Sequence, residues 1–71
     1  MTTLKQYREQ IGLSLTDLAR LSQVDYKTVK KADIRRGTIQ RGKAIKIIKT
    51  INEKLDLNLR VEDIDGLETT N

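Results

Sequence analysis

Hydrophobic residues recur at intervals of three and four along most of the chain, which is the spacing of amphipathic helices. The first run begins at Thr3, where a Thr-x-x-Gln capping box predicts a helix that ends before Gly12. The inner face of this helix is expected to consist of Leu4, Tyr7 and Ile11. A second helix is expected after Ser14, because serine caps helix N-termini well. Its expected inward positions are Leu15, Leu18, Ala19, Leu21 and Ser22.

The third run carries its charges on one side only. A helix is predicted from about Tyr26 to Ala32, with Asp25 as its N-cap. Val29 and Ala32 point to one side of this helix. Its three lysines fall within an opposite arc of about 100°; they are Lys27, Lys30 and Lys31. The pattern therefore predicts one buried face and one face that meets a negatively charged partner.

A fourth helix is predicted from Lys43, again with an apolar arc of about 100°. The residues of this arc are Ala44, Ile47, Ile48, Ile51 and Leu55, and those opposite are Lys46, Lys49 and Glu53. A helix lying on a membrane surface shares this pattern, but so short a chain needs the stripe for its core. A last short helix is predicted at about 61–65. The alternation of Leu55, Leu57 and Leu59 is also typical of a strand, but the sequence pattern predicts no second strand with which it could pair.

These elements together predict an all-α fold, a compact bundle of four to five short helices. Two glycines and the loss of helical period predict a loop over residues 33–42. The bundle is expected to form one domain over residues 1–67, followed by a disordered tail at 68–71. With 71 residues, the chain is near the lower limit for a self-sustaining core.

The composition argues against catalysis. The chain has no cysteine and no histidine, so it lacks thiol nucleophiles, thiolate metal sites and the commonest general base. Its carboxylates lie mostly in the C-terminal segment, and no phosphate-binding loop is present. We therefore expect no enzyme activity, no metal, no cofactor and no small-molecule ligand. No apolar run approaches the ~18 residues that a membrane span needs, and the start MTTLKQYRE does not resemble a signal peptide.

Charge is strongly segregated along the chain. The formal net charge is +4, but residues 26–49 alone carry nine basic residues against one acid, Asp33. Residues 52–71 carry two basic residues against six acids. The basic block coincides with the third helix and the segment after it, which is the electrostatic footprint expected for binding phosphates. A charged face that is merely solvated is the alternative.

Residues at fixed offsets make the second and third helices resemble the helix-turn-helix of the phage repressor and Cro-like (XRE-type) family. The pattern L-x-x-L-A-x-x-S-x-V-x-x-x-x-V is matched by Leu15, Leu18, Ala19, Ser22, Val24 and Val29, and Gly12-Leu13-Ser14 matches the family's entry to the motif. The resemblance covers about residues 4–64 and is strongest through residue 33. The family usually has glycine in the turn, where positive φ is easily adopted, so Gln23 must accept strain or a different turn.

The resemblance implies a repressor-like DNA-binding domain whose third helix enters the major groove. The side chains it presents to bases are Tyr26, Lys27, Lys30 and Lys31. The side chains expected at phosphates are Ser14, Thr16, Arg35, Arg36 and Arg41. The family also implies an ion pair that fastens the first helix to the third, for which Arg8 and Asp33 are the matching residues. A tyrosine ring that only covers the edge of the motif is the alternative for Tyr26.

The expected partner is double-stranded DNA and the expected role is that of a small transcriptional regulator, a repressor, in the cytoplasm. A DNA-binding antitoxin or adaptor is one alternative. A protein-interaction module that uses the same basic face is another. The family usually reads two half-sites as a dimer, so a homodimer, formed in solution or only on DNA, stays open. The operator, any effector and the sign of regulation do not follow from the sequence.

Overall fold

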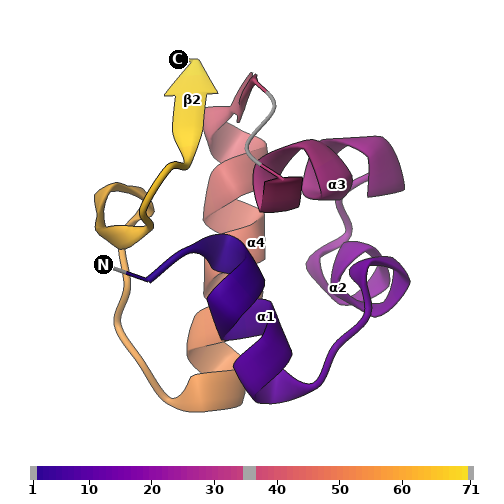
Figure 1. Cartoon of the computed structure of the whole chain (residues 1–71), viewed down its shortest axis with the longest axis vertical. Coiled ribbons are helices and arrows are strands. Elements are labelled where there is room, and N and C mark those ends of the chain that lie inside the picture. Colours follow the sequence, from indigo (N-terminus) through magenta and orange to yellow (C-terminus); the bar gives the residue numbers. More distant parts are fainter. Residues whose placement is uncertain (1, 35–36, 71) are drawn as a thin grey trace.

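The longest helix of the described residues, α4 (Arg41–Leu55), packs against the first two helices, both strands and the 3₁₀ turn, whereas the third helix packs mainly against the first two helices and the first strand. The computed structural model describes residues 2–34 and 37–70. Before α4 come α1 (Leu4–Ile11), α2 (Leu15–Ser22), α3 (Tyr26–Ile34) and the strand β1 (Thr38–Gln40); after it come a 3₁₀ turn, η1 (Val61–Asp63), and the strand β2 (Glu68–Thr70). In Figure 1, α1 lies in front of α4, α2 and α3 lie to its right, and η1 and β2 lie to its left.

The buried core is aliphatic, because the chain has no phenylalanine or tryptophan and Tyr7 is only partly buried against the core. The most deeply buried large side chains are Leu4, Leu18, Val29, Ile47 and Ile51. They come from all four α-helices, so the stripes predicted from helical spacing meet in one cluster. The stripe of α4 is buried as predicted, with Leu55 partly buried at its end. One expectation is wrong, because Leu21 does not face inward and is 44% exposed.

The helix boundaries follow the local signals. Thr3 and Gln6 form the expected capping box, and α1 ends at Gly12 with φ of 80°. The hydroxyl of Ser14 accepts a hydrogen bond from the Asp17 N–H and caps α2. Helix α4 begins at Arg41, two residues earlier than predicted. The reason is that the preceding Gln40 still has extended backbone as the last residue of β1 and serves as the cap residue.

Two strands correct the all-α prediction. β1 lies in the segment expected to be a loop, and β2 lies in the tail expected to be disordered. They pair in parallel with Ile39 opposite Thr69, and the Ile39 side chain is buried in the core. The described chain is therefore mostly helical with a two-stranded parallel sheet. Pairing across 30 residues gives β2 a partner that no local pattern reveals.

The segment after α4 also differs from its prediction. The last helix, expected at 61–65, is the single 3₁₀ turn η1. Residues 57–60 form no strand, and instead the side-chain amide of Asn52 donates to the Leu59 carbonyl at 3.1 Å and accepts from the Leu59 N–H at 2.9 Å. The Asp65 N–H donates to the Thr2 carbonyl, which ties the start of the chain to this segment.

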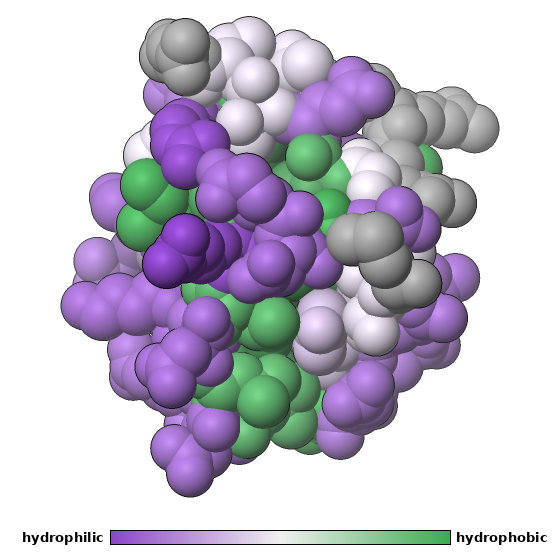
Figure 2. Space-filling view, turned by 90° about the vertical axis from the view of Figure 1, so that its left-hand side faces the viewer, coloured by the Kyte–Doolittle hydropathy of each residue, from purple (hydrophilic) through white to green (hydrophobic). Residues whose placement is uncertain are grey.

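Some apolar surface is left outside the core. Figure 2 looks at the side that carries η1 and β2 and shows hydrophobic surface gathered in its lower half between hydrophilic side chains. The exposed large apolar residues are Leu21, Tyr26, Ile34, Ile45 and Leu57. Over residues 2–34 and 37–70, none of the helices has the length and apolar character needed to cross a membrane.

Candidate nucleic-acid interface

A tight turn sets the angle between α2 and α3. Gln23 ends α2 in the left-handed region, with φ of 59° and ψ of 36°. Its N–H donates to the Arg20 carbonyl, and the N–H of Val24 donates to the Ala19 carbonyl at 3.1 Å. Val24 is then buried beneath the turn. The sequence's departure from glycine is thus accommodated by a strained residue at the turn rather than by a different turn.

The two faces of α3 differ as the spacing predicts. Val29 and Ala32 are buried against α2 and the rest of the core. Lys27, Lys30 and Lys31 are all exposed. Because the buried face holds α3 in place, the three ammonium groups are presented from a fixed scaffold.

Tyr26 stands at the start of the same helix. Its side chain is 46% exposed. The ring is therefore accessible to a partner.

The Lys31 side chain packs against Gly37, which leaves room for it because glycine has no side chain. A methyl group built on Gly37 would lie 2.7 Å from Lys31 Cε, so the lysine stem passes directly over this residue's backbone. Gly37 also has φ of 136°, which side chains rarely allow. A larger residue at 37 would displace the Lys31 stem. From the sequence alone, Gly37 indicates only a loop.

The start of α3 is fastened by a carboxylate. Asp25 accepts hydrogen bonds from the Thr28 N–H at 3.1 Å and from the Thr28 hydroxyl at 2.8 Å. It also accepts from Lys43 Nζ of α4 at 3.0 Å. The hydrogen bonds from Thr28 and then from Lys43 lower the pKa of Asp25 to about 2. The predicted cap is present, and its pairing with Lys43 joins α3 to α4.

The end of α3 is fastened by an ion pair. Arg8 Nε donates to Asp33 Oδ1 at 2.8 Å, and Arg8 Nη2 donates to Oδ2 at 3.4 Å. Arg8 Nη1 donates to the Leu13 carbonyl at 2.9 Å. The side chains of Arg8 and Asp33 are 15% and 3% exposed. The ion pair expected from the sequence is thus present, and it is largely shielded from water.

The side chains expected to contact phosphates differ in how free they are to bind a partner. Ser14 and Thr16 are exposed at the start of α2. Arg41 is exposed but donates to Glu62 Oε1 at 2.7 Å, so it is already paired. That hydrogen bond lowers the pKa of Glu62. Arg35 and Arg36 lie outside the described residues.

No group of three or more acidic, cysteine or histidine residues in the described ranges is placed to hold a metal ion. Within residues 25–34 the exposed charged side chains are Lys27, Lys30, Lys31 and Asp25, and Asp25 is paired with Lys43. The arrangement is suited to binding an anionic surface. Comparison with protein-family models, with curated proteins and with solved structures finds no match to this chain.

Proposed function

We propose that this protein binds double-stranded DNA in a sequence-specific manner and acts as a small transcriptional regulator. The observation that carries the proposal is the division of α3 into a lysine-bearing exposed face and a buried face. The proposal is further supported by α2, the turn at Gln23 and α3, since two short helices joined by a tight turn are what a helix-turn-helix requires. Each end of α3 is held by a carboxylate, Asp25 at its start and Asp33 near its end.

In the proposed complex, α3 lies in the major groove, which is about 12 Å wide and accepts one helix. Lys27 and Lys31 donate to guanine O6 and N7, which are acceptors displayed in that groove. Tyr26, at the start of the helix, packs against a thymine methyl group or donates to a phosphate. Lys30 lies nearer to one backbone strand.

Phosphate contacts fix the register of the helix but carry little sequence information. Ser14 and Thr16 stand at the start of α2, where free N–H groups favour an anion. Arg41 can contact a phosphate only if its ion pair with Glu62 breaks. Arg35 and Arg36 are further candidates from the sequence.

The test is a selection of bound duplexes from a random DNA pool, followed by affinity measurements on the enriched sequence at several salt concentrations. With roughly five phosphates neutralised per chain, log K should fall against log salt with a slope of about −4 to −5. A variant with Lys27, Lys30 and Lys31 all changed to alanine should lose binding. All three residues are exposed, so its circular dichroism should match the parent.

Lys54→Ala is the matched control, since Lys54 is also an exposed helical lysine but lies at the far end of α4. Its affinity should stay within about twofold of the parent. Failure to enrich any sequence, or an affinity indifferent to salt, would overturn the proposal. If binding is found, repression is expected when the selected site overlaps a reporter promoter, because a bound domain excludes other proteins from that site.

A further inference from the structure

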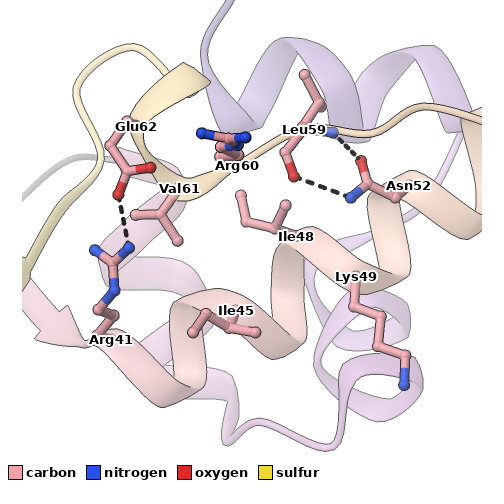
Figure 3. Close-up of a pocket in the computed structure, with 9 residues that line it drawn as sticks. All are labelled: Arg41, Ile45, Ile48, Lys49, Asn52, Leu59, Arg60, Val61 and Glu62. Atoms are coloured by element: carbon pink, nitrogen blue, oxygen red, sulfur yellow. Dashed lines mark hydrogen bonds and ion pairs between the residues drawn. The ribbon is translucent and has the colours of Figure 1, made fainter.

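A second surface of the molecule has the character of a docking groove. It lies between α4 and residues 59–62 and has a volume of about 370 Å³. Its apolar lining comes from Ile45 and Ile48 on one side and from Leu59 and Val61 on the other (Figure 3). Ile45 is 51% exposed, the largest exposure among the large apolar side chains of the described chain.

Two polar contacts brace the walls of this groove. Arg41 pairs with Glu62 across one end, and Asn52 binds both backbone groups of Leu59 across the other (Figure 3). The groove is thus preformed. The polar atoms of these braces are already engaged, so they do not supply the convergent polar groups typical of a small-molecule site.

The charges around the groove favour an acidic occupant. Arg41, Lys49 and Arg60 lie on its lining against one acid, Glu62, which Arg41 already neutralises. Among residues 2–34 and 37–70, neither Lys49 nor Arg60 takes part in an ion pair. A second copy that docked through the same face would bring these cations together, which is unfavourable.

From this geometry we infer that the groove binds a short acidic amphipathic segment of another protein. Apolar side chains of that segment sit on Ile45 and Ile48, and its carboxylates face Lys49 and Arg60. No residue of α1, α2 or α3 lines the groove, so it is separate from the lysine face of α3. The groove shares Arg41 with the proposed phosphate contacts, but the inference goes beyond DNA binding and does not depend on it.

The probe is a library of random 16-residue peptides displayed on phage and selected on the full chain without DNA. The selected peptides should be net negative and carry two or more large apolar residues. The best of them, made synthetically, should perturb the backbone amide signals of Ile45, Ile48 and Val61 in NMR spectra. Binding should weaken as salt is raised, because the attraction is partly between exposed charges.

Matched variants locate the contact. Ile45→Asp should weaken the peptide about tenfold or more, as loss of a central apolar anchor does. Leu57→Asp removes an exposed apolar side chain outside the groove and should change affinity less than about twofold. Lys49→Glu and Arg60→Glu should each weaken binding about threefold or more, whereas Lys54→Glu, on the same helix as Lys49 but off the groove, should not.

Several outcomes would overturn the inference. They are the absence of any enriched peptide, enrichment of neutral or basic peptides, or binding that Ile45→Asp leaves intact. Self-association of the chain that Ile45→Asp abolishes would identify a second copy as the occupant instead. Because no assay contains DNA, these results are independent of whether the chain binds a duplex.

Discussion

Replacing Arg8 by alanine should be among the most damaging single changes outside the apolar core. It removes the three hydrogen bonds that Arg8 donates to Asp33 and to the Leu13 carbonyl. The Asp33 side chain, only 3% exposed, is then left without its compensating charge. Breaking a buried pair in this way costs about 3–5 kcal/mol.

That cost is large for so small a domain. At the usual stability per residue, a 71-residue domain has a total of about 4–10 kcal/mol. A loss of 3 kcal/mol should lower the melting temperature by about 12 °C or more, at 4–8 °C per kcal/mol. Thermal unfolding followed by circular dichroism, together with urea titration, measures both quantities.

Arg20→Ala is the matched control. Arg20 also pairs with an aspartate, Asp17 at 3.1 Å, but the two side chains are 74% and 42% exposed. Its removal should change stability by less than about 0.5 kcal/mol. The double variant of Arg8 and Asp33 to alanine should be less destabilised than the sum of the single variants. If Arg8→Ala melts within a degree or two of the parent, the pair is superficial and the reasoning is wrong.

Three further substitutions test the charge of Asp25, the turn at Gln23 and the hydrogen bonds of Asn52. The pKa of Asp25 is depressed from 3.8 to about 2, so the stability that its carboxylate contributes is present above pH 4 and is lost as pH falls through about 2. Asp25→Asn should therefore flatten the decrease in unfolding free energy between pH 4 and 2, measured by urea titration. An unchanged pH profile would contradict the role of the charge. Gln23→Gly should raise stability by about 0.5–1 kcal/mol, since relief of left-handed strain exceeds the entropy that glycine loses; a lower melting temperature would contradict it. Asn52→Ala should cost about 1–3 kcal/mol by leaving the backbone groups of Leu59 without partners, and a neutral result in the same titration would mean that water replaces the amide.

The helices could be predicted because their signals are local. The capping box at Thr3, the glycine at 12 and the four-residue recurrence of apolar side chains act within one or two turns. The same local signals indicate that Gln23 occupies a turn position that favours glycine, and in the structure Gln23 adopts the positive φ itself. The ion pair of Arg8 and Asp33 joins residues 25 apart and was expected only through the family resemblance.

The features that the sequence did not predict depend on distant partners. β1 and β2 have three residues each, too few for an alternating pattern, and they pair across 30 positions. Arginine is a residue type that often contacts phosphate, but in the fold the Arg41 side chain is paired with Glu62, 21 residues away. The helical pattern left Ile45 off the apolar stripe of α4 but did not show that residues 59–62 would form the other wall of a groove beside it.

We propose that the lysines of α3 contact base edges from a helix that the core holds in place. The most direct test compares the sequences that the parent and Lys31→Ala enrich from the same random duplex pool. The parent should enrich a defined sequence, and Lys31→Ala should lose preference at one base position, at about 1–3 kcal/mol, while keeping the others. Enrichment of identical sequences by the parent, Lys31→Ala and Lys27→Ala would contradict the claim, as would the absence of any enriched sequence for the parent.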